Sequence, residues 1–160
     1  MRLGTLTLEQ CELVRTWRNL PDVLPMLRTR EPLTAEQQAT FYRDIVCDPS
    51  PTPRHRYYAL SHEDQFVGMG GLTYLDRVEG EGEISLILGP DFRQGGLGTL
   101  AVDALRTEGG RLGLQWIVGT CYDANPGRAF WVKTILRCEA TAQLAPDRLF
   151  FRMTTITGAA

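Results

Sequence analysis

The chain has 160 residues and a mass of 17.9 kDa, which predicts one domain covering residues 1–160. Hydrophobic residues make up 43% and charged residues 22%, as in globular proteins, so extensive disorder and collagen-like repetition are excluded. The net charge is −2 and no dense Lys/Arg block is present, so no nucleic-acid partner is expected. No run of about 18 apolar residues exists, so no membrane span or membrane partner is expected either.

The beginning of the chain and its cysteines indicate one cellular compartment. Residues 1–6 contain no signal-peptide core, and the four cysteines show no CxxC spacing. Thiols without a secretory signal fit a reducing environment, which predicts a cytoplasmic protein. Because only two histidines accompany the cysteines, no metal site is expected.

The first third of the chain predicts a short strand and two helices. Residues 1–6 are typical of a strand, and Thr7–Gln10 has the spacing of a capping box. Apolar residues at helical spacing continue to Asn19–Pro21, where the proline predicts the end of the helix. A second capping box at Thr34–Gln37 predicts a helix that reaches about Val46.

The middle of the chain changes to the pattern of strands. Arg56–Ser61, Gln65–Leu75 and Glu81–Leu88 are short apolar runs separated by turn residues, which predicts an antiparallel meander. A helix follows, because apolar residues recur at helical spacing. These residues are Leu97, Leu100, Ala101, Ala104 and Leu105.

The last third predicts three strands and one helix. Gln115–Cys121 is typical of a buried strand, and Asn125 with Pro126 predicts the N-cap and first turn of a helix to about Leu136. Two strands, Cys138–Leu144 and Arg148–Ile156, complete the chain. The predicted fold class is therefore α/β, with a mixed, mostly antiparallel central sheet of about seven strands and helices on both faces.

A glycine-rich segment before the strongest helix carries the clearest chemical signal. The segment Arg93-Gln94-Gly95-Gly96-Leu97-Gly98 can approach a ligand closely, because three of its residues lack a side chain. The first amides of the following helix stay unpaired at its positive end, which suits a phosphate group. Arg93 adds a fixed charge beside them.

Several interpretations of this segment compete. A nucleotide P-loop is excluded, because Thr99 follows Gly98 with no lysine between them. Gly96–Ala101 fits the G-x-G-x-x-A pattern of dinucleotide-binding proteins, with Asp123 as the acid for the ribose, although few residues follow for repeated βαβ units. A glycine-rich turn without any ligand is a further alternative.

The same hexapeptide resembles the R/Q-x-x-G-x-G/A signature of the GNAT superfamily, the acyl-CoA-dependent N-acetyltransferases. The preceding strand ending in Gly89-Pro90, the helix that follows and Asn125 beyond the next strand extend the resemblance. The order of elements is similar to that family over nearly the whole chain. The resemblance implies a GNAT-like fold and an enzyme that transfers an acetyl group from acetyl-CoA to a primary amine by direct attack.

The resemblance also implies how acetyl-CoA would be held. The strand Leu86–Leu88 would pair with the pantetheine amides like an added strand, and the amides of Gln94–Thr99 would hold the pyrophosphate. Asn125 matches the family asparagine that contacts the cofactor, and Arg128 would lie near its phosphates or adenine. The expected cofactor-binding residues are Leu86, Ile87, Leu88, Arg93, Gln94, Gly95, Gly96, Leu97, Gly98, Thr99, Asn125 and Arg128.

One departure from the family concerns the general acid. The family often places a tyrosine on the helix after this asparagine, as the acid for the departing thiolate. The corresponding stretch here is Phe130-Trp131-Val132-Lys133, without a tyrosine. Tyr122 is the nearby candidate; alternatively, the thiolate leaves without a dedicated donor.

Acyl transfer also needs an unprotonated amine, and amine pKa values of about 8 to about 10.4 call for a base near pH 7. Glu79, Glu81 and Glu83 alternate, so a regular strand would place them on one face, where crowded carboxylates raise one another's pKa values. Glu83 is nearest to the expected cofactor strand and is the candidate base, directly or through water. The alternative is a solvated hairpin whose acids take no part.

The first two helices and their connection would form the acceptor side. Trp17-Arg18-Asn19, with Met26, Arg28 and Arg30, resembles that region in two GNAT groups. One group acetylates nucleotide-linked aminosugars, and the other comprises the Rim-type enzymes that acetylate protein N-termini. Arg28 and Arg30 could bind an acceptor phosphate, which favours the nucleotide sugar; the alternative is two solvated arginines.

Aromatic residues and two other function classes complete the expectations. Trp116 and Trp131 are expected in the core, and the pair Phe150-Phe151 belongs in the sheet core or at an edge where a homodimer forms. A non-catalytic acyl-CoA-binding module stays open because of the missing tyrosine. An NAD-dependent oxidoreductase stays open because of the dinucleotide-like glycine pattern.

Overall fold

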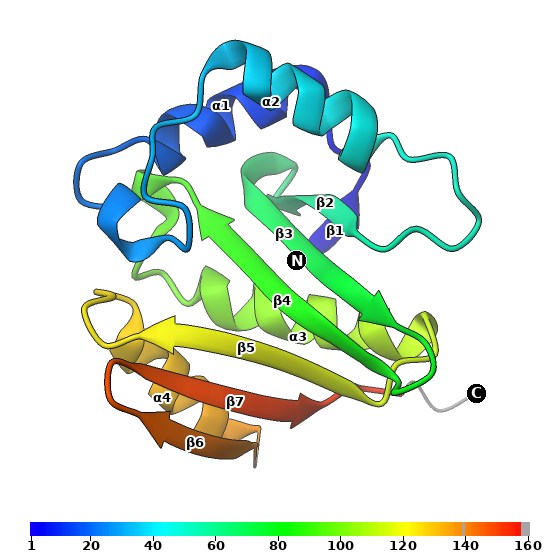
Figure 1. Ribbon diagram of the computed structural model, residues 1–160, viewed down its shortest axis with the longest axis vertical. Coiled ribbons are helices and arrows are strands. Elements are labelled where there is room, and N and C mark those ends of the chain that lie inside the picture. The colour runs from blue at the N-terminus through cyan, green and yellow to red at the C-terminus, as the bar shows by residue number, and fades with distance from the viewer. Residues whose placement is uncertain (139, 158–160) are drawn as a thin grey trace.

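A sheet of seven strands forms the middle of the part of the molecule that the computed structural model describes, residues 1–138 and 140–157 (Figure 1). The strands are β1 (Arg2–Gly4), β2 (Arg56–His62), β3 (Gln65–Asp76), β4 (Glu81–Leu88), β5 (Trp116–Tyr122), β6 (Thr141–Ala145) and β7 (Arg148–Thr154). The helices are α1 (Leu8–Arg18), α2 (Ala35–Phe41), α3 (Leu97–Arg111) and α4 (Arg128–Arg137). The spatial order β1-β2-β3-β4-β5-β7-β6 has one parallel pair, β4 with β5, among the described strands. The predicted mixed, mostly antiparallel sheet is confirmed.

Both predicted capping boxes are present and begin α1 and α2. The Thr7 hydroxyl accepts a hydrogen bond from the Gln10 amide at 3.2 Å, and Thr34 does the same for Gln37 at 3.2 Å. The second helix reaches Val46 as expected, but its last turn, Tyr42–Val46, is a π-helix. Its wider hydrogen-bond spacing appears in the Cys47 amide, which donates to the Tyr42 carbonyl at 2.9 Å.

Two hydrophobic layers pack against the sheet. α3 and α4 lie behind it in Figure 1, over side chains that include Leu72, Ile117 and Phe151. α1 and α2 cover the opposite face of β2 and β3 around Cys11 and Ala59. Because α1 and α2 stop there, no helix of the described chain packs over the front of β5, β7 and β6. None of the described helices is long and apolar enough to span a bilayer.

The predicted apolar stripe of α3 is confirmed at Ala101 and Leu105, which are buried, whereas Leu100 is 42% exposed. Two other local expectations were wrong. Asn125 is not the N-cap of α4: its carboxamide oxygen accepts from the Gly127 amide at 2.7 Å in a turn, and the helix begins after Gly127. Cys138 caps the end of α4 rather than starting a strand, and residue 139 of that expected strand lies outside the described residues.

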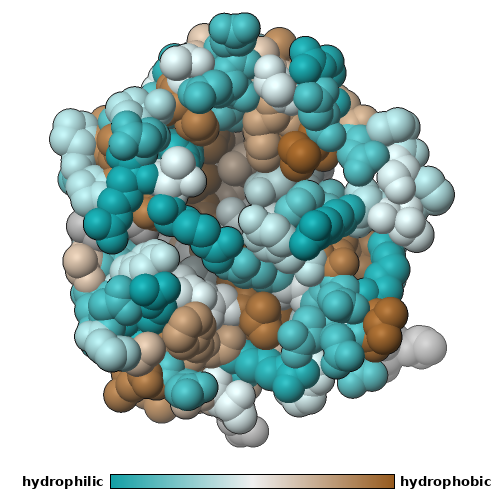
Figure 2. Space-filling model, viewed as in Figure 1, coloured by the Kyte–Doolittle hydropathy of each residue, from teal (hydrophilic) through white to brown (hydrophobic). Residues whose placement is uncertain are grey.

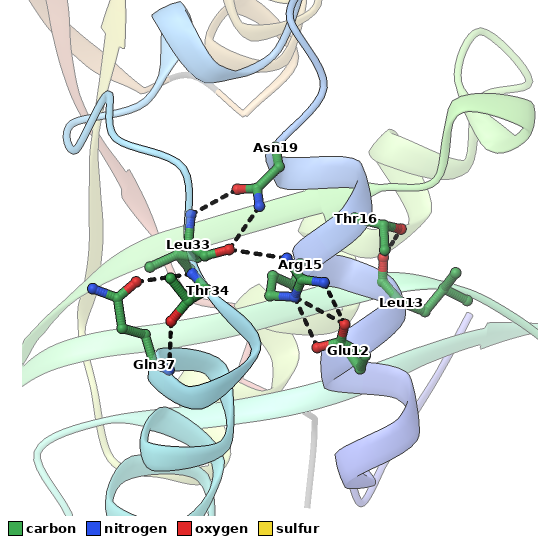
Figure 3. Close-up of polar contacts among 8 residues, drawn as sticks. All are labelled: Glu12, Leu13, Arg15, Thr16, Asn19, Leu33, Thr34 and Gln37. Atoms are coloured by element: carbon green, nitrogen blue, oxygen red, sulfur yellow. Dashed lines mark hydrogen bonds and ion pairs between the residues drawn. The ribbon is translucent and has the colours of Figure 1, made fainter.

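Hydrogen bonds between α1 and the start of α2 close the connection between them (Figure 3). The Asn19 side chain donates to the Leu33 carbonyl at 2.8 Å and accepts from the Leu33 amide at 2.9 Å. Arg15 donates to the same carbonyl at 2.9 Å and is itself held by Glu12. These hydrogen bonds hold together the two ends of the connecting segment, residues 20–32. This segment carries Arg28 and Arg30, the two arginines expected on the acceptor side.

We expect Asn19→Ala to lower the free energy of unfolding by about 1–2 kcal/mol, because the Leu33 amide loses its partner and the Leu33 carbonyl keeps only Arg15. The Leu33 amide should also exchange its proton with solvent faster, as measured by hydrogen exchange. Thr16→Ala is the control, because the Thr16 hydroxyl bonds only to the Leu13 carbonyl within α1, at 2.7 Å. Equal effects of the two substitutions on Leu33 exchange would contradict this role of Asn19.

Candidate active site

The two parallel strands of the sheet separate soon after they meet. β4 pairs with β5 at Glu81–Glu83 against Trp116–Val118, and the two strands then diverge (Figure 1). β4 stays paired with β3 as far as Leu88, and Leu86 packs into the core on the α3 side. The edge of β4 that carries Leu86, Ile87 and Leu88 therefore has no strand beside it within the described chain, while the strand itself is held firmly.

The glycine-rich segment follows this free edge after one turn of 3-10 helix, Pro90–Phe92. The backbone turns through Gln94, with φ +74°, and Gly96, with φ +79°, and Gly96 becomes the N-cap of α3 without a side-chain cap. A Cβ atom at Gly95 or Gly96 would meet nothing within 4 Å, so this loop borders open space. Gly98 instead packs against the ring of Phe130 on α4. Uncapped amides at a positive helix end, bordering open space, fit a phosphate group.

Thr99 and Arg93, at the two ends of the glycine-rich segment, have partners within the protein. The Thr99 amide donates to the Gly96 carbonyl at 3.0 Å, so it is part of the helix. The Arg93 side chain donates to the Leu88 carbonyl at 3.2 Å, and its guanidinium lies 3.8 Å from the carboxylate of Asp22. Arg93 therefore ties the end of β4 to the connection between α1 and α2.

The loop after β5 carries the remaining expected residues. Arg128 lies 2.9 Å from the Asp123 carboxylate at the start of α4. Tyr122 ends β5, and the guanidinium of Arg148 lies 4.9 Å from the centre of its ring. Cys121 is buried, and burial raises the pKa of its thiol, so it is poorly suited to carry an acyl group.

The candidate base meets a candidate substrate-binding residue directly. Arg28 donates to the Glu83 carboxylate at 2.6 Å across 55 positions of sequence. The Glu83 side chain is 25% exposed and that of Arg28 is 58% exposed. Arg30 is exposed. The hydrogen bond from Arg148 lowers the pKa of Asp147, and the positive charge of Arg30 lowers it further.

The expected row of three carboxylates is not formed. Glu79 lies in the turn before β4, where its amide is bound by the Asp76 carboxylate. Glu81 and Glu83 do share one face of β4, but each forms an ion pair with an arginine, Glu81 with Arg152. The premise that three carboxylates crowd together on one face is therefore wrong.

An aromatic and basic cluster beside Glu83 was missed by sequence reasoning. Tyr74 has φ +51° at an irregular point of β3, and the guanidinium groups of Arg28 and Arg54 lie 5.8 and 5.3 Å from its ring centre. The imidazole of His55 meets the ring edge-on, and burial lowers the pKa of His55. Burial raises the pKa of Tyr57, on the same side, to about 12. A positive φ at a tyrosine leaves no signature in the sequence, so this cluster could not be predicted.

The uncovered face of β5, β7 and β6 holds a pocket of about 450 Å³ that reaches Glu83. In the view of Figure 2, hydrophobic side chains reach the surface between hydrophilic ones over this part of the sheet. The lining includes Val118, Thr120, Gln143 and Phe150. The described residues contain no group of three or more potential metal ligands.

The aromatic expectations hold in part. Trp131 packs at the core and stacks on Phe151, as expected. Trp116 instead lies on the uncovered face, with the Arg152 guanidinium 4.3 Å from the centre of the Trp116 ring. Phe151 is in the core and Phe150 is 42% exposed, but β7 lies between β5 and β6, so the pair is not at a sheet edge.

The comparison with protein families decides between the interpretations of the glycine segment. The family model of the acetyltransferase (GNAT) domain matches residues 1–129, which is most of the chain. The chain belongs to the GNAT acetyltransferase family. This acyl-CoA-dependent N-acetyltransferase transfers an acetyl group to an amine and uses acetyl-CoA as its co-substrate. The assignment favours the acyl-CoA interpretation of the glycine segment over the dinucleotide one.

Solved structures of the same fold include two acetyltransferases crystallised with ligands. Spermidine N-acetyltransferase from Vibrio cholerae, in complex with CoA and spermine, has a TM-score of 0.81 at 13% identity, covering 96% of this chain and 95% of that one. The microcin C7 self-immunity acetyltransferase MccE, in complex with acetyl-CoA and AMP, has a TM-score of 0.73 at 16% identity, covering 95% and 91%. A search of curated protein sequences finds no significant match.

Proposed function

We propose that acetyl transfer takes place where β4 and β5 diverge, and that the acceptor is a primary amine of a small molecule or of a protein N-terminus. The observation that carries this proposal is the free edge of β4 beyond Glu83, which leads to the uncapped start of α3. A strand edge offers hydrogen bonds to the amides of pantetheine, and the helix start offers amides to a pyrophosphate. Acetyl-CoA needs both features, and a glycine-rich turn that binds no ligand would need neither of them.

The cofactor would be held mainly by backbone groups. Leu86, Ile87 and Leu88 would bind the pantetheine arm, and the amides of Gln94–Gly98 would bind the pyrophosphate. The Thr99 amide is bonded within the helix, so Thr99 would lie beside the pyrophosphate in the first turn without donating its amide to it. Asn125 would shape the loop beside the cofactor, and Arg128 would add positive charge near the phosphates. Acetyl-CoA itself supplies the thioester whose carbonyl carbon is attacked.

The reaction proposed at Glu83 is a direct transfer. Glu83 accepts a proton from the acceptor ammonium, directly or through water, and frees the lone pair of the nitrogen. The nitrogen attacks the thioester carbonyl to form a C–N bond, and the C–S bond breaks as the thiolate leaves. The nitrogen loses its second proton to water as the C–S bond breaks, and the thiolate takes up one proton, from water or from Tyr122, which then regains a proton from water. The products are an amide, CoA and one released proton.

The identity of the acceptor follows from the charges near Glu83. Arg28 and Arg30 support a nucleotide-linked aminosugar, because guanidinium groups bind phosphate well. Neighbouring structures contain either spermine or AMP, so this fold accommodates ligands of opposite charge.

Two wider proposals concern the whole chain. The match to the family model ends at residue 129, but β6 and β7 pair with β5 and complete the sheet, which supports one acetyltransferase domain over residues 1–160. A homodimer is also proposed, with support from the exposed Phe150 and from a neighbour described as dodecameric.

We expect Gly95→Glu to weaken CoA binding at least tenfold, because it places a carboxylate where the pyrophosphate would lie. The added side chain meets open space, so the fold should be retained. Gly4→Glu is the matched control, because a Cβ there also meets nothing within 4 Å, far from the site. Isothermal titration calorimetry measures both affinities. Equal CoA affinity in the two variants would refute the proposed phosphate site.

We expect Glu83→Gln to lower kcat most strongly at low pH, where the acceptor amine is most protonated and a base is most needed. The loss should shrink as pH rises toward the pKa of the amine. The measurement is the pH profile of thiol release from acetyl-CoA. Glu81→Gln serves as the control on the same face of β4. Wild-type turnover of Glu83→Gln at every pH would remove Glu83 from the role of base.

A further inference from the structure

The carboxylate proposed as the base is already occupied by a cation. Arg28 bonds to Glu83 at 2.6 Å, and the more exposed partner of this pair is Arg28, which lies on the connection between α1 and α2. An acceptor ammonium that approaches Glu83 must therefore displace this guanidinium. Because Arg28 is more than half exposed on a surface segment, its side chain can move without disturbing the core.

The surroundings of Glu83 carry more arginines than carboxylates in ion pairs with them, although the Asp48 carboxylate also acts on His55 beside Tyr74. Three carboxylates on this side each lie in an ion pair with an arginine: Glu81 with Arg152, Glu83 with Arg28, and Asp147 with Arg148. Two further arginines, Arg30 and Arg54, form no ion pair of their own among the residues that the structure describes, and Arg30 acts on the Asp147 carboxylate only as a second charge beside Arg148. The guanidinium groups of Arg54 and Arg28 both lie against the Tyr74 ring, so a second positive charge lies near the proposed base. A polycation would be repelled here, and an anion would be attracted.

We propose that the acceptor carries an anionic group, a phosphate or a carboxylate, in addition to its amine, and that Arg28 exchanges partners when the acceptor binds. This inference rests on the proposed function. The ammonium replaces the guanidinium at Glu83, and the released Arg28 binds the anion of the acceptor, with Arg54 across the Tyr74 ring adding a second positive charge. The number of ion pairs is then the same before and after binding. An acceptor that carries both an ammonium and an anion therefore replaces every ion pair that it breaks.

A neutral or polycationic amine would lack this compensation. It would leave Arg28 without a partner beside a second guanidinium, so the exchange becomes unfavourable. One charge-assisted hydrogen bond corresponds to roughly a tenfold difference in affinity or more. Phosphate and carboxylate both satisfy the chemistry, and the test below separates them.

The test compares kcat/KM over matched acceptors, corrected for the fraction of each amine that is protonated, because the ammonium is the form that replaces Arg28 at Glu83. Glucosamine 6-phosphate is compared with glucosamine, glycylglycine with its amide, and spermidine is the polycation. We expect at least one anionic member to exceed its neutral partner by about tenfold, with spermidine poorest. A preference in the sugar pair alone identifies phosphate, and one in the peptide pair alone identifies carboxylate. Added salt should reduce the preference, because it screens exposed charges.

Substitutions at Arg28 test the exchange itself. In Arg28→Gln, the kcat/KM for the anionic acceptor divided by that for its neutral partner should fall close to one. Arg28→Lys should keep most of the wild-type ratio. Arg111→Gln is the control, because Arg111 is an exposed arginine paired with Glu108 on α3, behind the sheet, and should leave the ratio unchanged. An unchanged ratio in Arg28→Gln would overturn the exchange.

The possible failures are distinguishable. If the enzyme acetylates glucosamine or spermidine as well as the anionic amines, the acceptor class is wrong, while the proposed acetyl transfer stands. If the wild-type protein binds acetyl-CoA and releases no thiol with any of these amines, both the proposed function and this inference are overturned.

Discussion

Strands β4 and β5 run parallel and pair at only three positions, Glu81–Glu83 against Trp116–Val118. Beyond Glu83 the two strands need separate partners, which β3 and β7 supply. The divergence leaves a length of β4 with an unpaired edge at the centre of the sheet rather than at its margin. The same strand leads into the glycine turn and the uncapped α3, so one interruption of pairing puts a strand edge and a helix start side by side.

On the proposed cofactor side, the main groups offered are those of the backbone. On the proposed acceptor side, they are charged side chains. Glu83 lies where the strands part, and Arg28 reaches it from a connection that is fixed at its base by Asn19 and Leu33. The arrangement places a cation on the proposed base. Charged groups in such a site contribute to discrimination between acceptors more than to raw affinity. In the proposed mechanism, these arginines favour amines that also carry an anionic group.

Much of the fold could be predicted from the sequence because its signals are local. The capping boxes at Thr7 and Thr34, the meander and the glycine hexapeptide each involve neighbouring residues. The errors have the opposite origin. The pairing of Arg28 with Glu83 joins positions 55 apart, the Tyr74 cluster depends on a positive φ, and Glu79 leaves the strand because the turn engages its amide. The acceptor side is built from such long-range contacts, so single-sequence patterns could name its residues but not their partners.

The most direct test of the central claim is a crystal structure of the protein with CoA bound. The account predicts that the pantetheine arm runs along Leu86–Leu88 as an added strand, and that the pyrophosphate accepts hydrogen bonds from amides within Gln94–Gly98. The sulfur should then point toward Glu83. A structure in which CoA lies elsewhere, or in which the glycine segment makes no contact with the pyrophosphate, would contradict it.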